Sequence, residues 1–463
     1  MTSLHLPYSV SLPGTTKMTL VCEQLVREIP GRREVYRGTL EGKSVYAKFF
    51  IDPRRGQRHY QRESDGARCL RDAGIVAPVL LYSGQVDGGY LVVYRAIECG
   101  VDGEQLWRQA DSKVRHQLLV KLTTIVAGLH NAGLVQRDLH FKNFVVSDDV
   151  VYTLDAGDIH KDPALSQGRA LDNVLLLFAQ CTPKYDRQSL ELLPLYCQQR
   201  GWTEDAINAE QALQHIRRLR AGRWHDYAKK IYRQCTAFEF RKSWRRRMLV
   251  DRDELSEDLR RVLDNPDAVM KASARSLKQG NTSTVAVVTI DGKPRVIKRY
   301  NIKGFWHGLN RLFRRSRASI SWRNAHRLRF HGIATPKPIA LLEHRFGPFR
   351  RRAYFICEYI TGPTALDYFN SKDCKADAKK QAAGRMVTIL NALAALRIGH
   401  GDMKATNFVI QDHYPYLIDL DAMRSYVGRC CYRKAHEKDI KRFLRNWNEQ
   451  PETGALFAGL ELY

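Results

Sequence analysis

An Asp, an Asn and a second Asp occur twice along the chain with identical spacing. The members are Asp138, Asn143 and Asp155 in the first half and Asp402, Asn407 and Asp419 in the second. The two intervals agree between the halves (143 − 138 = 407 − 402 = 5 and 155 − 143 = 419 − 407 = 12). One carboxylate can accept the proton of a substrate hydroxyl while the other two side chains hold Mg²⁺ and its phosphates. The repeated spacing therefore predicts two sites of phosphoryl transfer.

Asp138 and Asp402 are the predicted catalytic bases, because each lies in a loop that an apolar strand follows. The predicted Mg²⁺ ligands are Asn143, Asp155, Asn407 and Asp419. An Asp and an Asn five residues apart also arise by chance, and such residues often only cap helices or shape turns. The strand and the second Asp that follow each pair favour the catalytic interpretation.

A lysine within a strand pattern precedes each triad, Lys48 in VYAKFF and Lys298 in RVIKRY. An ammonium group at this place in a cleft could offset the charge of the nucleotide phosphates. Glu63, on the helix predicted next, is expected to pair with Lys48 and fix its direction. The alternative is an exposed strand lysine and a solvated glutamate, and the downstream triad favours function.

The second half lacks the counterpart of Glu63. Counting from the Gly-Ile pair of each half (332 − 74 = 258), the matching helix position is Ser321. Lys298 thus has no obvious carboxylate partner. Whether the second half is catalytic or non-catalytic stays open on the sequence.

Four further residues are candidates for nucleotide or metal binding. Lys404, two residues after Asp402, could reach a transferring phosphate, and Asp421 either binds metal or caps the next segment. Gly38 and Gly280 could let backbone amides approach the nucleotide phosphates, although hairpin geometry explains both equally well.

Two rounds of strand and helix patterns must position these residues. The first round predicts strands within 19–50, with a turn at residues 41–42, then a helix at 58–74. A strand at 89–97 follows, before a mainly helical remainder. The second round predicts a strand pair within 277–301, joined at residues 291–292.

This order predicts an α+β chain of two tandem protein-kinase-like domains, each with a small β-rich N-lobe and a helical C-lobe. The predicted limits are residues 1–17 for an N-terminal extension, 18–235 for the first domain and 236–463 for the second.

Composition narrows the class of protein. The 463 residues suffice for two or three domains, and we expect neither a secretory signal nor a membrane-spanning segment. The ten cysteines form no C-x-x-C pair, which indicates reduced thiols. A net charge of +26 favours an anionic partner such as a bilayer surface or an acidic glycolipid, with solvated arginines as the alternative. No aromatic-basic motif supports binding to nucleic acid.

The segment after each second Asp is short. A protein kinase has a long activation segment here that forms a platform for its peptide substrate. This chain instead reaches a helix within a short loop after Asp155 and Asp419, which favours a small or glycan acceptor. Asp172 and Asp439 are expected to head these helices as caps.

With these motifs, the chain resembles the lipopolysaccharide kinase family, which phosphorylates sugars of the lipopolysaccharide inner core. The resemblance rests on GIVAP, QRDLHFKN and LDAGD in the first half and on LKQGNTSTV, VIKRYN, SWRNAHRLRFHGIATPKP, HGDMKATN and IDLDAM in the second. It implies a protein-kinase-like fold, ATP and Mg²⁺ as cofactors, and a lipid-linked core oligosaccharide as acceptor. It also implies work at the cytoplasmic face of the inner membrane, where we expect peripheral attachment. Our leading hypothesis for the acceptor is a heptose hydroxyl. Gln136 departs from the histidine usual before Arg137-Asp138.

Two other functions compete with this one. A protein kinase would use the same triad, but the short segments after the second Asp argue against it. A pseudokinase scaffold in envelope assembly would bind nucleotide or partner enzymes without catalysis, and the complete set of residues in the first half argues against that.

Overall fold

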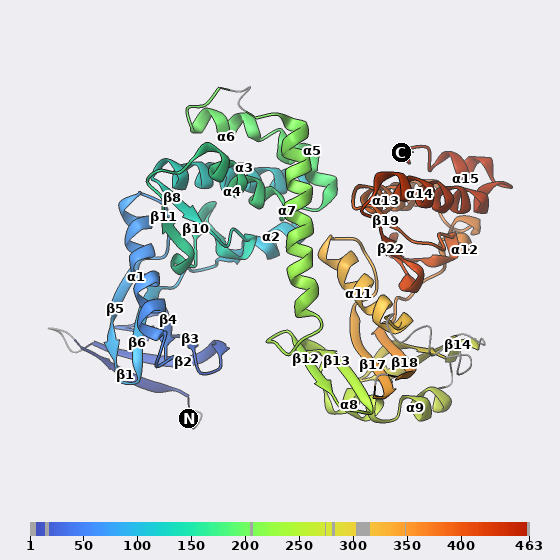
Figure 1. Ribbon diagram of the computed structural model, residues 1–463, viewed down its shortest axis with the longest axis horizontal. Helices are drawn as coiled ribbons and strands as arrows, with labels where there is room; N and C mark the ends of the chain where they lie inside the picture. The colour runs from blue at the N-terminus through green and yellow to red at the C-terminus, as the bar shows by residue number, and fades with distance from the viewer. Residues whose placement is uncertain are drawn as a thin grey trace. The chain divides into compact units, whose positions relative to one another are not determined.

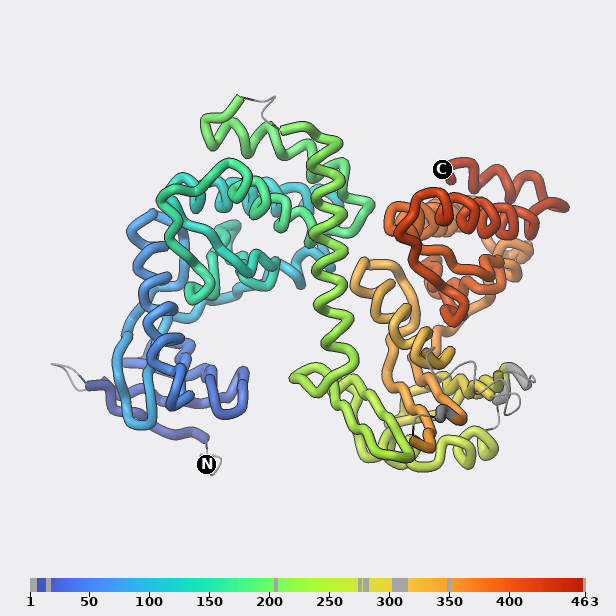
Figure 2. The backbone as a smooth tube through the Cα atoms, viewed as in Figure 1, coloured from blue at the N-terminus to red at the C-terminus, as the bar shows by residue number. Residues whose placement is uncertain are grey.

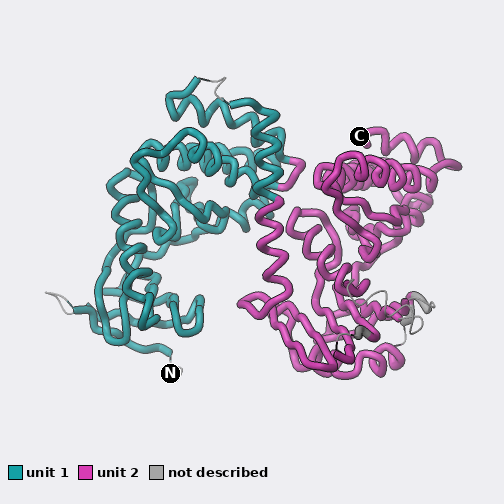
Figure 3. The backbone as a smooth tube through the Cα atoms, in the orientation of Figure 1, with its two compact units in different colours: residues 1–181, 185–220 teal, residues 182–184, 221–463 magenta. Residues whose placement is uncertain are grey.

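The computed structural model describes residues 6–13, 18–203, 207–273, 275–279, 283–301, 315–347 and 349–460. The chain is a mixed α+β protein that divides into two compact units. Unit 1 comprises residues 1–181 and 185–220, and unit 2 comprises residues 182–184 and 221–463 (Figure 3). Each unit has its own sheets, helices and hydrophobic cores. The domain limits that the sequence predicts stay a prediction.

Unit 1 begins with a six-stranded antiparallel sheet in the order β1-β2-β3-β4-β6-β5 (Figure 1). Its strands are β1 (Tyr8–Leu12), β2 (Met18–Ile29), β3 (Arg33–Leu40), β4 (Lys43–Phe50), β5 (Leu80–Val86) and β6 (Gly89–Arg95). Glu41 and Gly42 join β3 to β4 with φ of 50° and 74°, which a type I′ turn requires. The predicted strands and turn are confirmed. Helix α1 (Gly56–Asp72) contacts β4 and β6.

The rest of unit 1 is mainly helical. Its helices are α2 (Gly103–Gln109), α3 (Ser112–Asn131), α4 (Gln167–Phe178), α5 (Asp186–Leu190), α6 (Leu193–Gln199) and the first part of α7 (Ala209–Lys230). Short strands lie among them, namely β7 (Val101–Asp102), β8 (Leu134–Gln136), β9 (Phe144–Ser147), β10 (Val150–Thr153) and β11 (Ile159–Lys161). The pairs β9–β10 and β8–β11 hold the two loops that carry the first triad.

Unit 2 has a seven-stranded antiparallel sheet in the order β12-β13-β17-β18-β16-β15-β14. Its strands are β12 (Phe238–Lys242), β13 (Arg246–Asp251), β14 (Arg275–Gln279), β15 (Ser283–Ile290), β16 (Lys293–Tyr300), β17 (Pro338–Phe346) and β18 (Phe349–Glu358). Asp291 and Gly292, with φ of 51° and 70°, form the predicted turn between β15 and β16. The sheet has more strands than the sequence predicts, because β12 and β13 precede the predicted strand pair.

Both faces of this sheet are covered. Leu342 and Ile356 pack in one core with α8 (Glu257–Asp264) and α9 (Pro266–Ala272). Their neighbours Leu341 and Phe355 belong to the core that contains α11 (Arg317–Phe330). This alternation follows from the two-residue period of a strand, and it places α11 on one defined face.

The remainder of unit 2 is mainly helical, so the backbone of each unit passes from its sheet into its helices (Figure 2). The helices are α12 (Ala365–Asn370), α13 (Ala376–Ala395), α14 (Arg429–Leu444) and α15 (Pro451–Ala455). Strand β19 (Ile398–Gly399) pairs with β22 (Arg424–Ser425), and β20 (Phe408–Gln411) pairs with β21 (Tyr414–Leu417). The second triad lies in the loops that join these strands.

The sequence predicts that the chain has no membrane-spanning segment and that its cysteines are reduced. Among the described residues, no helix is long and apolar enough to cross a membrane. None of the ten cysteines forms a disulfide.

Candidate active sites

Lys48, on strand β4, is held by a buried carboxylate from helix α1. Its Nζ lies 2.6 Å from Oε1 of Glu63 and 3.6 Å from Oδ1 of Asp155. Glu63 is 1% exposed and also accepts hydrogen bonds from the hydroxyl of Tyr94 (2.9 Å) and the backbone N–H of Gly157 (3.2 Å). Burial and the charge of Glu63 raise the pKa of Tyr94 well above its usual value, so its hydroxyl stays a donor. The structure thus brings together Lys48, Glu63 and Asp155, whose roles stay predictions.

Each Asn of the triads holds the loop that carries the preceding Asp. The side-chain amide of Asn143 donates to the backbone oxygen of Asp138 at 2.7 Å, and Asn407 donates to the backbone oxygen of Asp402 at the same distance. Because the amide nitrogen is used in this contact, each Asn has its amide oxygen to offer to a cation.

The second Asp of each triad has the same unusual backbone conformation. Asp155 has φ 58° and ψ 57°, and Asp419 has φ 59° and ψ 56°. Residues other than glycine seldom adopt this left-handed region, and those that do often lie in functional sites. One carboxylate and one amide oxygen per site suit Mg²⁺, which prefers oxygen ligands and keeps waters and substrate phosphates as its other ligands.

Asp158 is a further carboxylate of the first site that the sequence patterns did not single out. Burial raises its pKa, and the negative charges of Asp155 and Asp138 raise it further. The guanidinium of Arg62 lies 3.5 Å from the Asp158 carboxylate and donates to the backbone oxygen of Gly157 at 3.0 Å. Asp158 thus shares the electrostatic environment of the first triad.

Of the two candidate glycines, Gly38 lies within the described residues. Gly38 lies within β3 opposite Cys22, where a Cβ atom would overlap the backbone oxygen of Val21. The close approach of β2 and β3 is therefore sufficient to explain this glycine. Gly280 lies outside the described residues.

In unit 2, Lys298 of strand β16 pairs with two carboxylates of one loop. Its Nζ donates to Asp419, and it lies 3.0 Å from Oδ2 of Asp421. The same oxygen of Asp421 lies 3.0 Å from the guanidinium of Arg317, at the start of α11. Burial alone would lower the pKa of Lys298, but nearby Tyr300, Asp419 and Asp421 raise it above its usual value. Asp421, which the sequence left as a metal ligand or a cap, thus anchors the lysine.

The two units supply this anchoring carboxylate from different elements. In unit 1 it is Glu63 on α1, and the loop has Gly157, whose Cβ would lie 2.9 Å from the Glu63 carboxylate. In unit 2 the helix position is Ser321, which bonds to Tyr300 (2.9 Å). The loop position that matches Gly157 (419 − 155 = 264, 157 + 264 = 421) carries Asp421. A small residue on one element therefore accompanies a carboxylate on the other.

Asp402 lies between two cations. The guanidinium of Arg442, on α14, is 2.8 Å from its Oδ1, and Nζ of Lys404 is 3.1 Å from the same oxygen. The sequence predicted Lys404 but missed Arg442, because 40 residues separate it from Asp402 (442 − 402 = 40).

The loop that carries Asp402 is fixed from α14. The buried carboxylate of Asp439 accepts hydrogen bonds from the backbone N–H groups of His400 (2.7 Å) and Gly401 (3.1 Å). The prediction that Asp172 and Asp439 cap helices is wrong, since both lie inside their helices, α4 and α14. Asp172 instead pairs with His215 at 3.3 Å.

A strand lysine, an Asp on a fixed loop, and an Asn and Asp that can hold a cation are the groups that phosphoryl transfer requires. Residues 267–460 match the sequence model of the lipopolysaccharide kinase (Kdo/WaaP) family. The resemblance is therefore confirmed for this part of the chain, which includes Lys298 and the whole second triad. The match supports a phosphotransferase linked to lipopolysaccharide. A search of curated proteins gives no match.

Proposed function

We propose that this protein is an ATP-dependent kinase that phosphorylates a sugar of the lipopolysaccharide inner core, with a heptose hydroxyl as acceptor. The proposal is carried by one observation. Within the segment that matches the family, one set of loops and strand β16 bring together Lys298, Asp402, Asn407 and Asp419.

Both units are protein-kinase-like domains in tandem under this proposal. Each has an antiparallel sheet that carries a lysine, a helix packed on that sheet, and a triad in loops between short strands. The exchange between Glu63 and Asp421 leaves both lysines with a carboxylate partner. This supports catalysis in unit 2 despite Ser321.

Each residue of the unit 2 site has its own role in the reaction. Asp402 orients the attacking hydroxyl and accepts its proton as the oxygen–phosphorus bond forms and ADP leaves. Lys298 balances the charge of the nucleotide phosphates, and Lys404 and Arg442 place two further cations beside the reacting oxygen. Asn407 and Asp419 would hold Mg²⁺, which would neutralise charge on the nucleotide phosphates. Positioning and electrostatic stabilisation provide most of the rate gain.

The acceptor is lipid-linked core oligosaccharide at the cytoplasmic face of the inner membrane, and the protein attaches there peripherally. Two hairpin tips of unit 2 support the attachment. Trp244 and Phe346 are 65% and 56% exposed, and their rings contact edge to face with centroids 6.2 Å apart. Arg245 and Arg351 are exposed beside them. Aromatic rings among arginines suit the interface of an anionic bilayer.

The test is transfer of label from γ-labelled ATP to purified, dephosphorylated core lipopolysaccharide. Wild type is compared with Asp138→Ala and Asp402→Ala, and exposed Asp87→Ala and Asp373→Ala are the matched controls. Loss of label with Asp402→Ala alone makes unit 2 the enzyme, and loss with Asp138→Ala alone makes unit 1 the enzyme. Partial loss with each means two working sites. No label with wild type that still binds ATP would refute the proposed function.

A further inference from the structure

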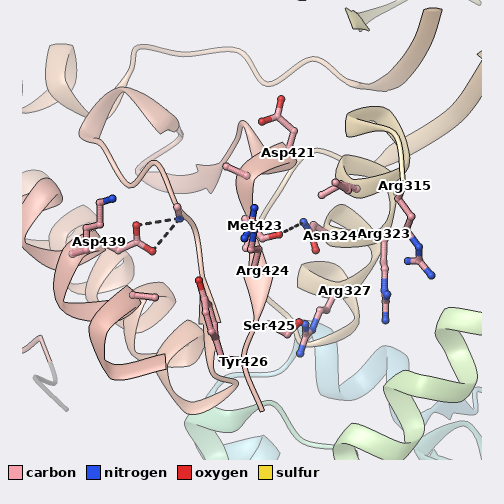
Figure 4. Close-up of a pocket in the computed structure, with 15 residues that line it drawn as sticks. Arg315, Arg323, Asn324, Arg327, Asp421, Met423, Arg424, Ser425, Tyr426 and Asp439 are labelled. Atoms are coloured by element: carbon pink, nitrogen blue, oxygen red, sulfur yellow. Dashed lines mark hydrogen bonds between the residues drawn. The ribbon is translucent and has the colours of Figure 1, made fainter. Parts of the chain in front are cut away.

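A pocket of about 800 Å³ lies beside the loop that carries Asp419 and Asp421 in unit 2. Helix α11 forms one side of it, and strand β22 with helix α14 forms the other (Figure 4). A volume of this size accommodates a small organic molecule rather than a single ion.

Five cationic side chains line this pocket. They are Arg315, Arg323, Arg327, Arg424 and Lys438. Among the described residues, no carboxylate forms an ion pair with any of them. The two acids of the lining are engaged elsewhere, because Asp421 pairs with Lys298 and Arg317, and Asp439 accepts from the backbone of His400 and Gly401. The pocket therefore has a strong excess of positive charge.

This arrangement is unfavourable without an anion. Arg323 and Arg327 lie one turn apart on α11, where like charges repel. Burial, together with the nearby charge of Arg323, lowers the pKa of Arg327 to about 10. The Nε of Arg327 is buried and, within the described part of the chain, has no hydrogen-bond partner. A bound anion would offset the repulsion between Arg323 and Arg327 and would give the Nε of Arg327 a hydrogen-bond acceptor.

The charge is not a general property of this part of the fold. The positions of α1 in unit 1 that match Arg323 and Arg327 carry Asp65 and Cys69 (323 − 258 = 65, 327 − 258 = 69). The two arginines of α11 thus have no cationic counterpart at the matching positions of unit 1.

We propose that this pocket binds a sugar phosphate, with the guanidinium groups of Arg323, Arg327 and Arg424 on the phosphate. A phosphate dianion needs more than one cation, and guanidinium groups match its oxygens with paired N–H donors. The rest of the pocket, which includes Ser425 and Tyr426, has room and polar groups for sugar hydroxyls. This proposal does not rest on the proposed kinase activity.

Isothermal titration calorimetry of the full chain tests the proposal at fixed ionic strength, with a non-hydrolysable ATP analogue and Mg²⁺ present to fill the nucleotide sites. The probes are glucose 6-phosphate, glucose, inorganic phosphate and micelles of phosphorylated core lipopolysaccharide. The variants are Arg323→Gln and Arg424→Gln. Arg329→Gln is the matched control, since Arg329 is exposed on the same helix and lies outside the pocket lining.

Glucose 6-phosphate should bind more tightly than glucose or inorganic phosphate, and each pocket variant should weaken this binding about tenfold or more. Arg329→Gln should change it less than about twofold. The same pattern with the micelles alone would identify the phosphorylated sugar as lipid-linked. Equal affinity for inorganic phosphate and glucose 6-phosphate, or equal losses in all three variants, would overturn the proposal.

Discussion

The aspartates that open the two triads have different neighbours. Asp402 contacts the cations of Lys404 and Arg442, whereas the residue of unit 1 that matches Lys404 is His140 (404 − 264 = 140). Cations beside the reacting oxygen stabilise the negative charge of a transferring phosphoryl group more than that of the bound substrate, because this charge develops toward the acceptor. Under the proposed function, the residues around Asp402 should therefore affect the rate of transfer more than substrate binding.

Replacement of Arg442 by Gln should lower the kcat of unit 2 about 10- to 100-fold and change the KM for ATP little, since the guanidinium acts at the acceptor side. Steady-state kinetics in an Asp138→Ala background measures this effect. Lys441→Gln removes the same charge from the neighbouring exposed position and should behave like the background enzyme. A rise in the KM for ATP with unchanged kcat would contradict the assigned role.

Buried histidines make the stability of the protein depend on pH. Burial lowers the pKa of His326 to about 3, against about 6.5 in the unfolded chain. Because the folded state disfavours the charged form, the stability that His326 contributes is present above pH 6.5 and is lost as the pH falls toward 3. The loss between pH 7 and pH 5 should be about 2 kcal/mol.

Urea denaturation at pH 7 and pH 5 measures this loss. His326→Phe should remove it from the transition of unit 2, because a phenyl ring fits among Trp322, Phe238 and Tyr227 and does not titrate. His225→Phe, at an exposed position, should retain it. An unchanged pH dependence in His326→Phe would contradict the explanation.

At the scale of elements, a helix in unit 1 and a loop in unit 2 supply the carboxylate that holds the strand lysine. The lysine of each unit is held by a carboxylate that approaches from helix α1 in unit 1 and from the loop after β21 in unit 2. The position facing each carboxylate is small, Gly157 or Ser321, because two carboxylates would not fit side by side without repulsion. The helix position and the loop position therefore both differ between the two units, Glu63 with Gly157 in unit 1 and Ser321 with Asp421 in unit 2.

Asp421→Gly should raise the KM of unit 2 for ATP about tenfold or more, since Lys298 and Arg317 lose a shared charged partner. The double variant Ser321→Glu, Asp421→Gly rebuilds the arrangement of unit 1 and should recover part of this loss. Kinetics in the Asp138→Ala background, with circular dichroism to verify folding, provides the measurement. Ser321→Glu alone should not improve activity, and an equally impaired double variant would argue against the exchange.

The sequence predicted elements with strong local patterns and missed those without them. The hairpins at Gly42 and Gly292 were predicted from turn chemistry and are confirmed. Strand β13 begins in a run of arginines, in which Arg246 and Arg247 pair with Asp264 and Glu343. Such pairs depend on residues distant in sequence, so a local pattern cannot reveal them.

The same limit applies to the sites. The spacing of each triad is a local pattern and could be recognised in the sequence. Lys48 and Glu63 meet as expected. The contact of Asp421 with Lys298 joins residues 123 positions apart (421 − 298 = 123), and that of Arg442 with Asp402 depends on the register of α14. Only the folded chain brings these groups together.

At the scale of the whole molecule, the net charge of +26 and the two exposed hairpin tips predict a salt-sensitive association with anionic membranes. The Coulombic part attracts the protein, and the rings of Trp244 and Phe346 enter the interface. Neither contribution alone gives stable attachment.

Vesicles that contain phosphatidylglycerol should bind the protein at low salt and release most of it at about 0.5 M NaCl, because screening shortens the range of the attraction. Co-sedimentation measures the bound fraction, with phosphatidylcholine vesicles as reference. Trp244→Ala with Phe346→Ala should weaken binding several-fold, whereas Tyr414→Ala, at another exposed aromatic ring, should not. Equal binding to both kinds of vesicle would contradict the prediction.

Helix α14 has a consequence for selective inhibition. Asp439 and Arg442 lie one turn apart on it, one holding the backbone before Asp402 and the other holding its carboxylate. A compound that bound between α14 and α11, beside Lys438, and shifted α14 would displace both contacts at once. It would stop transfer without competing with ATP, and it would spare enzymes whose corresponding helix lacks this pair.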